Sequence, residues 1–203
     1  MAVERCLFQG YLGIMSQLKY RPKSTVEDYL SLPPDVRAEL IEGELYMTPS
    51  PRPRHQEIGS NVNSVLKDYV VARHLGQVYF APLDVFLPSG SIVQSDVIFI
   101  VRDNLFIVGD RLEGVPDLLF EVVSPSGAVR DRLVKRRLYA DNGVPEYWSV
   151  DDESRSVEVL TLVGGEYAPD GYFVVGHDDG ERVRSRVVSG FTCPCAEIFQ
   201  TFL

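Results

Sequence analysis

The stretch Asp117-Leu118-Leu119-Phe120-Glu121-Val122-Val123-Ser124 is one of the most apolar in the chain, and it decides the fold. The run predicts a strand that is buried in a sheet. Glu121 stands in the middle of that strand. A lone carboxylate is costly to bury, so it needs a cation, a hydrogen-bond network or a bound metal. The strand therefore predicts a polar site inside the core.

A second apolar segment carries the same anomaly. Residues 92–101 are rich in β-branched side chains, yet Asp96 lies among them. Asp96, Glu121 and the main-chain carbonyl of Val122 offer hard oxygen ligands, which suit Mg²⁺ or Mn²⁺. On neighbouring strands these groups predict a shared metal site. Another interpretation stays open for each carboxylate alone, namely a residue near a sheet end that pairs with an arginine.

The segment after the Glu121 strand predicts a helix over residues 128–142. Such a helix folds back over its own sheet, so it is a candidate to cover the face on which Glu121 lies. Asp131, Lys135 and Tyr139 recur at intervals of four residues and form one row. This row places the Lys135 ammonium beside both carboxylates. The packed side of the helix is expected to hold Val129, Leu133, Val134 and Leu138.

Two carboxylates, a divalent ion and a lysine indicate one kind of chemistry. The ion binds a phosphate oxygen, lowers the pKa of a bound water and offsets charge on the leaving oxygen. The lysine orients the water or stabilises the charge that develops on phosphorus oxygens. These residues therefore predict hydrolysis of a phosphodiester.

Outward from these strands, the pattern predicts short elements joined by turns. A first helix is expected from Ser24 to about Leu32, with a capping box formed by Ser24 and Glu27. A second helix is expected over His55–His74, with Gly76 just past its end, and a third at 195–202. A hairpin is expected to turn at Gly43, and further strands are expected at 77–87 with a bend at Pro82, 92–101, 144–150, 156–162, 172–175 and 181–188. A polar connection covers residues 103–114, and turn signals separate the C-terminal strands into hairpins.

The composition fits one globular α/β domain. The chain has 203 residues, of which 45% are apolar, and these values fit a single domain. We expect this domain over residues 24–203 and an N-terminal extension over residues 1–23. Lys and Arg number 20 against 29 Asp and Glu, which gives a formal charge of −9. That sign opposes polyanion binding unless a local basic patch exists, and residues 128–137 form the densest one.

The cysteines and the hydropathy indicate a compartment. Cys6, Cys193 and Cys195 are an odd number without framework spacing, which is typical of a reducing cytoplasm. No apolar run has the length needed to cross a bilayer, and the first residues do not predict a signal peptide. We therefore expect a cytoplasmic protein that does not enter a membrane.

Taken together, these segments resemble the Uma-type endonuclease family of the PD-(D/E)XK restriction-endonuclease-like superfamily. The resemblance runs in the family's order over roughly residues 24–200. The matching stretches are 39–44, 51–55, 93–96, 120–126, 131–139, 143–151 and 155–159. It implies an α/β fold with a restriction-endonuclease-like core, in which a central mixed β-sheet is flanked by helices and followed by additional C-terminal β-hairpins.

The resemblance also implies roles for individual residues. Asp96 and Glu121 become metal ligands, and Glu44 becomes a supporting carboxylate. Val123 occupies the position two residues after Glu121 where the superfamily carries its lysine, so the resemblance implies that Lys135 takes that lysine's place. Catalysis then depends on Lys135 reaching the site from the helix.

Other polar residues near these motifs have more than one reading. Arg54 is a candidate for contact with the substrate or support of the site, and His55 either contacts phosphate, helps to position Glu44, or is only a polar residue at a helix start. Tyr139 either hydrogen-bonds within the site or only packs, and Glu44 either supports the site or flanks the turn at Gly43. Glu39 and Glu42 are expected at the surface, whereas Tyr147 and Trp148 are expected in the core.

The functional prediction is a Mg²⁺-dependent (or Mn²⁺-dependent) endonuclease that hydrolyses DNA phosphodiester bonds. Cutting both strands of a duplex is simplest with two symmetric sites, so a homodimer is expected. Two alternatives stay open. One is a catalytically inactive module of the same fold that binds nucleic acid or protein. The other is a nuclease for RNA or branched DNA.

Overall fold

A computed structural model describes residues 23–123, 130–176 and 182–201, and for residues 130–132 it describes the backbone alone. Its main feature is a six-stranded mixed sheet of order β11-β10-β9-β8-β6-β3. The strands are β3 (Gly76–Phe80), β6 (Val97–Val101), β8 (Leu118–Val123), β9 (Glu146–Asp151), β10 (Ser156–Val163) and β11 (Glu166–Val174). Only the β8–β9 pair in this sheet is parallel. The central strand β8 is thus the predicted Glu121 strand.

Two smaller sheets complete the strand inventory of the described residues. A five-stranded sheet of order β2-β1-β5-β4-β7 comprises β1 (Ala38–Ile41), β2 (Glu44–Met47), β4 (Val85–Phe86), β5 (Ile92–Val93) and β7 (Leu112–Glu113). The hairpin of β12 (Arg182–Arg184) and β13 (Thr192–Pro194) forms a two-stranded sheet. The expected C-terminal β-hairpins are therefore present as β10–β11 and β12–β13.

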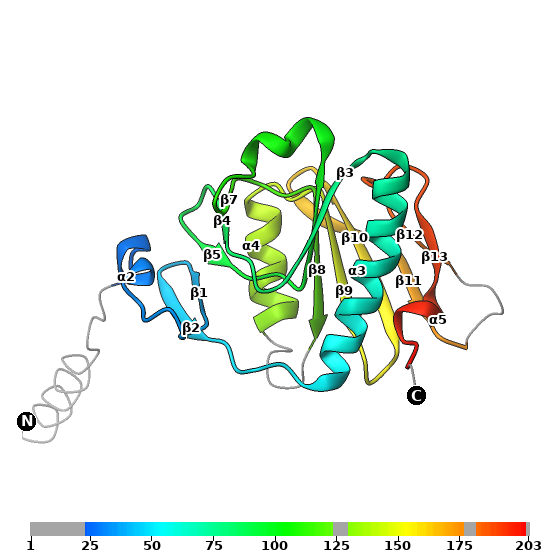
Figure 1. Cartoon of the computed structure of the whole chain (residues 1–203), viewed down its shortest axis with the longest axis horizontal. Coiled ribbons are helices and arrows are strands. Elements are labelled where there is room, and N and C mark those ends of the chain that lie inside the picture. Colours follow the sequence, from blue (N-terminus) through cyan, green and yellow to red (C-terminus); the bar gives the residue numbers. More distant parts are fainter. Residues whose placement is uncertain (1–22, 124–129, 177–181, 202–203) are drawn as a thin grey trace, which may run out of the picture.

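Helices cover both faces of the six-stranded sheet (Figure 1). The helical elements are α2 (Val26–Leu30), α3 (Pro53–Arg73), the 3₁₀ turn η1 (Arg102–Ile107), the π-helical η2 (Arg130–Lys135), α4 (Arg136–Asp141) and α5 (Cys195–Ile198). Helix α3 packs on one face together with α5 and the β12–β13 hairpin. Helix α4 and the five-stranded sheet pack on the other face. The result is the expected α/β architecture.

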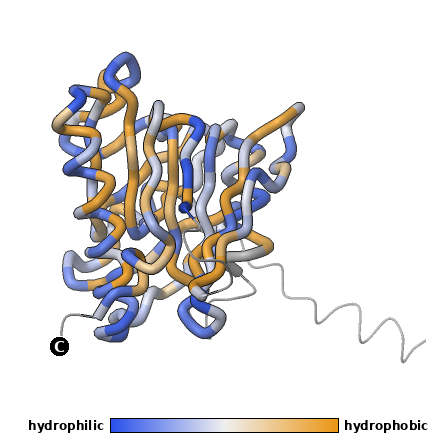
Figure 2. The backbone as a smooth tube through the Cα atoms, turned by 90° about the vertical axis from the view of Figure 1, so that its right-hand side faces the viewer, coloured by the Kyte–Doolittle hydropathy of each residue, from blue (hydrophilic) through white to orange (hydrophobic). Residues whose placement is uncertain are grey.

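Strand alternation divides the interior into two apolar cores. In β8, Leu118, Phe120 and Val122 face α3, whereas Leu119 faces α4. Tyr147 and Trp148 on β9 are both buried, as predicted. Figure 2 shows apolar residues along the strands in the middle of the molecule and polar residues at the turns. Glu121 shares the α4 side with Leu119, so it is a charge placed within an apolar layer.

Two expected strands are each divided between the two larger sheets. The run 77–87 becomes β3 and β4, which are separated at Ala81 and Pro82 because proline cannot donate to a strand ladder. The run 92–101 becomes β5 and β6, which are separated by Gln94, Ser95 and Asp96. The prediction of single strands was wrong there.

Three helix boundaries differ from expectation. The capping box of α2 uses Thr25 and Asp28, one residue later than predicted. Helix α3 ends at His74, whose left-handed φ of 56° takes the role assigned to Gly76. The predicted helix over 128–142 begins with the π-helix η2, and residues 128–129 lie outside the described part of the chain. Leu133 is 67% exposed instead of packed, and it lies within the π-helical η2, whose turns do not follow the α-helical spacing used for the prediction.

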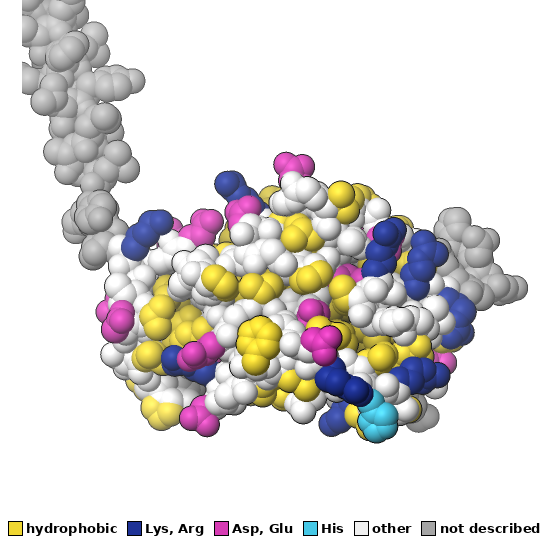
Figure 3. All heavy atoms as spheres, turned by 90° about the horizontal axis from the view of Figure 1, so that it is seen from above, with side chains coloured by type: hydrophobic (Ala, Val, Ile, Leu, Met, Phe, Trp, Pro, Cys, Tyr) yellow, Lys and Arg dark blue, Asp and Glu magenta, His cyan; other side chains and the backbone are white. Residues whose placement is uncertain are grey.

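Charge on the surface is mixed. On the face seen in Figure 3, basic, acidic and apolar side chains are interspersed. Within the described ranges, no helix has both the length and the apolar character to span a membrane.

Candidate active site

Lys135 lies between two buried carboxylates. Its Nζ is 3.0 Å from Oε1 of Glu121 on β8 and 2.8 Å from Oε1 of Glu39 on β1. No more than 5% of any of these three side chains is exposed. Buried charges are tolerated only when they are paired and hydrogen-bonded. The lysine at the junction of η2 and α4 thus supplies the cation that the burial of Glu121 requires.

Tyr139 adds a hydrogen bond to the same carboxylate. Its hydroxyl donates to Oε1 of Glu121 at 2.6 Å, and its ring meets Tyr147 edge to face at 5.4 Å between centroids. Burial, and next the carboxylate of Glu121, raise the pKa of the Tyr139 phenol well above its ordinary value. The phenol therefore stays protonated and remains a donor.

The local fold explains why these groups meet. Alternation along β8 turns Glu121 toward the layer that contains α4. Lys135 and Tyr139 are four residues apart, so they lie on one side of the helical segment and point at the same strand. The sequence prediction of this row is consistent with the observed contacts of Lys135 and Tyr139, although Asp131 has no described side chain.

Asp96 is anchored to β8 one residue beyond Glu121. Val97 pairs with Phe120, so the next step along this antiparallel ladder places Asp96 opposite Glu121. Oδ2 of Asp96 accepts a hydrogen bond of 2.8 Å from the main-chain N–H of Val122. The structure thus brings the two predicted metal-binding carboxylates to the same end of β8. The proposed ligand role of the Val122 carbonyl stays a prediction.

His55 contacts Asp96 from the first turn of α3. Its Nε2 lies 3.4 Å from Oδ2 of Asp96, and the two side chains are 19% and 16% exposed. The Glu39–Lys135–Glu121 group is more deeply buried than this pair. The site therefore has a closed interior end and an end that solvent can reach, where His55 and Asp96 lie.

A polar network extends from the site toward α2. The main-chain N–H of Gln94 donates to Oε1 of Glu39 at 2.9 Å, and its side-chain amide donates to Oδ1 of Asp84 at 2.8 Å. The Tyr29 hydroxyl donates to the same Asp84 oxygen at 3.0 Å. Oε1 of Glu39 is thus contacted by both the Gln94 N–H and the Lys135 ammonium.

Glu39 is the site residue that sequence reasoning missed. It was expected at the surface, yet it is 1% exposed. Ala38, Leu40 and Ile41 around it are also buried, so Glu39 is a charge within an apolar run, which is the same signal that drew attention to Glu121. Glu42 and Glu44, which flank the turn, made the whole segment look polar and exposed.

Glu44 is not brought to the cluster. It pairs with Ile41 beside the hairpin turn, is exposed, and accepts a hydrogen bond of 2.9 Å from the Tyr46 hydroxyl. Glu39 pairs with Tyr46 and lies two residues further from the turn than Ile41 does. At this position it contacts Lys135 at the start of α4. The carboxylate of this hairpin that contacts Lys135 is Glu39.

Arg54 is engaged in holding the fold together. Its guanidinium contacts Asp152 at 3.0 Å and Glu57 at 3.1 Å, and donates to the carbonyl of Phe199 at 2.9 Å. These contacts fasten the first turn of α3 to the C-terminal segment. They leave the predicted role of Arg54 near the substrate without structural support.

The donor set fits a divalent cation. Glu39, Glu121 and Asp96 bring three formal negative charges against one formal positive charge on Lys135, so carboxylates outnumber cations in this cluster. Across residues 23–123, 130–176 and 182–201, no three Asp, Glu, His or Cys side chains gather closely enough to hold an ion alone. Mg²⁺ suits such a site, because it commonly takes one or two carboxylates and completes its shell with water and substrate oxygens.

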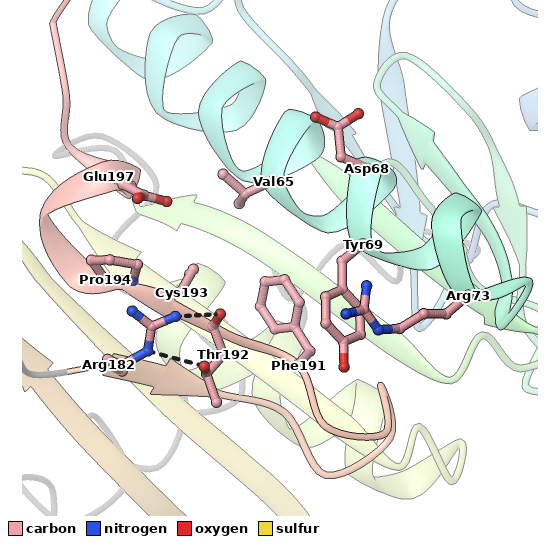
Figure 4. Close-up of a pocket in the computed structure, with 10 residues that line it drawn as sticks. All are labelled: Val65, Asp68, Tyr69, Arg73, Arg182, Phe191, Thr192, Cys193, Pro194 and Glu197. Carbon is pink, nitrogen blue, oxygen red and sulfur yellow. Dashed lines mark hydrogen bonds between the residues drawn. The ribbon is translucent and has the colours of Figure 1, made fainter.

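A separate hollow of about 430 Å³ lies between α3 and the β12–β13 hairpin (Figure 4). Its charged groups are two arginines and two carboxylates, and the arginines are engaged. Arg73 stacks over Tyr69 at 3.9 Å, and Arg182 donates to Thr192. Burial raises the pKa of the Cys193 thiol in its wall to about 12, so this thiol stays protonated and unreactive.

The mixed sheet flanked by helices has the architecture of the restriction-endonuclease-like class of α/β proteins. Within that class, the chain belongs to the Uma2 family, whose model is described as "Putative restriction endonuclease" and matches residues 26–196. This confirms the resemblance read from the sequence motifs.

The fold has a counterpart among solved structures. The chain is similar to a protein from Anabaena variabilis ATCC 29413 described as "a putative nuclease belonging to DUF820", with a TM-score of 0.71 and 18% sequence identity. The similarity covers 86% of this chain and 97% of that one, which confirms the fold prediction. No match was found among curated proteins.

Proposed function

We propose that the protein is a metal-dependent endonuclease that hydrolyses phosphodiester bonds of DNA. One observation carries the proposal. Lys135 reaches Glu121 at 3.0 Å from the helix, although Val123 occupies the strand position where the superfamily carries its lysine. A buried cation beside a strand carboxylate is the arrangement that the chemistry needs, and here it is built from two elements instead of one.

Each residue of the site has a defined task in this proposal. Asp96 and Glu121 hold the divalent ion, and Tyr139 fixes the orientation of the Glu121 carboxylate. Glu39 and Glu121 hold Lys135, whose charge stabilises the negative charge that develops on the phosphate oxygens. A water attacks phosphorus, and the bond from phosphorus to the leaving sugar oxygen breaks.

The ion proposed is Mg²⁺ or Mn²⁺. When bound, it supplies Lewis-acid polarisation of a phosphate oxygen and a lower pKa for a bound water. Asp96 and Glu121 are the residues that would hold it, since both present a carboxylate at the same end of β8. The active species proposed is a homodimer, because a duplex has two strands to cut.

Cleavage assays test the proposal. Supercoiled and linear duplexes, single strands, branched DNA and RNA are incubated with Mg²⁺, with Mn²⁺ or with EDTA. Asp96→Asn and Glu121→Gln are expected to lower the cleavage rate by about a hundredfold or more, because ligand and supporting residues of metal sites have effects of this order. Glu153→Gln, an exposed carboxylate, is the matched control and should retain the activity of the unmodified protein.

The assignment fails if both site variants cleave as fast as the Glu153→Gln control. Absence of cleavage on every substrate, together with no Mg²⁺ or Mn²⁺ binding in calorimetry, would favour an inactive binding module. Cleavage confined to RNA or to branched DNA would retain the chemistry and change the substrate.

A further inference from the structure

Arg37 lies on the face of the β1–β2 hairpin that carries Glu39. Glu39 pairs with Tyr46, and the main-chain N–H of Thr48 donates to the carbonyl of Arg37 at 2.9 Å. The pairing therefore extends one step past the strand ends, with Arg37 opposite Thr48. Side chains two residues apart on a strand share a face, so Arg37 and Thr48 come next after Glu39 and Tyr46.

Gln94 links Arg37 to the candidate active site. The main-chain N–H of Gln94 donates to Glu39 at 2.9 Å, and its side-chain carbonyl accepts from Nη2 of Arg37 at 3.4 Å. The guanidinium is thus separated by a single residue from the carboxylate that holds Lys135.

The Arg37 guanidinium has few partners for a partly buried cation. It forms no ion pair with a carboxylate of the described residues, and its Nε is buried without a described hydrogen-bond partner. Oγ1 of Thr48 is likewise buried without one. Buried polar groups are nearly always hydrogen-bonded, so two exceptions side by side call for a ligand or a rearrangement that satisfies them.

We propose that Arg37, assisted by the Thr48 hydroxyl, binds a backbone phosphate of the nucleic-acid strand held at the site. This inference rests on the proposed nuclease function and names a residue that positions its substrate. A guanidinium presents a planar set of donors that matches phosphate oxygens, and a hydroxyl adds one more donor. Phosphate contacts of this kind set the register of a strand without reading its sequence. A local cation is also what a protein of charge −9 needs in order to hold a polyanion.

Binding measurements over a range of salt concentrations test this inference. Fluorescence anisotropy follows a labelled DNA duplex, a DNA single strand and an RNA strand, in EDTA and again in Ca²⁺. Arg37→Met is expected to weaken binding about tenfold and to lower the slope of log K against log salt by about one, because one phosphate contact is lost. Arg37→Lys should recover the salt slope but only part of the affinity, since an ammonium lacks the guanidinium fork.

Two further variants separate substrate contact from a structural role. Arg73→Met removes an exposed arginine that stacks over Tyr69 on the far part of α3, and it should leave affinity and salt slope unchanged. Thr48→Val removes the hydroxyl at nearly constant volume and should weaken binding without changing the salt slope. A loss of affinity in Arg37→Met with an unchanged salt slope would mean that Arg37 supports Gln94 and does not bind phosphate.

The inference is overturned if Arg37→Met binds every probe like Arg73→Met, or if the unmodified protein binds none of them. Arg37-dependent binding without cleavage of any substrate would support the phosphate contact and refute the nuclease proposal. Cleavage with unchanged KM in Arg37→Met would support the nuclease proposal and refute the phosphate contact. A phosphate contact limited to RNA would identify the strand without altering the role of Arg37.

Discussion

At the scale of single residues, the molecule is organised around a lysine held by two acidic side chains. Lys135 is 2% exposed and contacts Glu39 and Glu121 within 3.0 Å. The helix residue Lys135 meets one carboxylate from each of the two larger sheets. Removing one member of such a group leaves a buried charge without its partner, which is strongly destabilising.

Lys135→Met is therefore expected to destabilise the fold by about 3–5 kcal/mol, because two buried carboxylates lose their shared cation. Urea unfolding measures the loss. The exposed Lys67→Met on α3 is the control and should stay within about 0.5 kcal/mol of the unmodified protein.

Glu39→Gln combined with Lys135→Met should regain part of the stability lost in Lys135→Met alone. The coupling between the two substitutions is expected to be about 0.5–3 kcal/mol. Equal stabilities of Lys135→Met and Lys67→Met would contradict the buried ion pair.

At the scale of elements, β9 carries a third buried carboxylate, Glu146, with a different task. Glu146 accepts hydrogen bonds from Trp148 Nε1 at 2.6 Å and from the main-chain N–H groups of Arg186 at 2.7 Å and Val187 at 3.2 Å. It thereby fastens the segment before β13 to the central sheet. Burial raises the pKa of the Glu146 carboxyl above its usual 4.5, and the Ser185 and main-chain contacts only partly oppose that rise.

This shift predicts a pH dependence of stability. The native state holds the Glu146 proton more tightly than the unfolded chain does. The contribution of this group is therefore greatest below pH 4.5, falls as pH rises toward the native pKa, and then levels off. One such group changes the free energy of unfolding by at most about 1.4 kcal/mol per pH unit.

Glu146→Gln is expected to remove this decline. The fluorescence of Trp148, the single tryptophan of the chain, reports unfolding at each pH. An exposed Glu153→Gln variant should keep the pH dependence of the unmodified protein. A decline of the same steepness in Glu146→Gln would show that other groups cause it.

At the scale of the whole molecule, both layers on the central sheet contribute to one site. Helix α3 brings His55 to Asp96 from one face, while η2 and α4 bring Lys135 and Tyr139 to Glu121 from the other. The site is thus formed at the end of β8, where the two layers meet. Ion binding there should couple to the stability of the entire fold.

Mn²⁺ at a hundred times its dissociation constant is expected to stabilise the protein by about 2.7 kcal/mol. Thermal unfolding with and without the ion measures this stabilisation. An Asp96→Asn and Glu121→Gln double variant should lose it, whereas Glu153→Gln should keep it. Equal stabilisation of the double variant would place the bound ion elsewhere.

Local patterns predicted the parts of the fold that depend on neighbouring residues. The strand around Glu121 followed from its apolar run, and the facing of its side chains followed from strand alternation. The Lys135–Tyr139 row followed from helical spacing, whereas the exposure of Leu133 within η2 did not. The division of residues 77–87 and 92–101 between sheets did not follow, because it depends on pairing with distant strands.

The role of Glu39 shows the limit most clearly. Glu39 and Glu44 stand on the same hairpin, and their sequence context is nearly the same. Only the docking of the hairpin under the helix decides which of them is buried. The apolar neighbours of Glu39 indicate burial, but nothing local in the sequence shows that Lys135 would be its partner.

The origin of Lys135 in a helix has a consequence for biosynthesis. Glu39, Asp96, Glu121 and Lys135 are contributed by segments almost a hundred residues apart in the order of translation. A nascent chain that has not yet reached residue 135 lacks Lys135, so it carries no assembled centre. If the protein cuts DNA, the nascent chain can cleave the host genome only after all four residues have been synthesised and folded together.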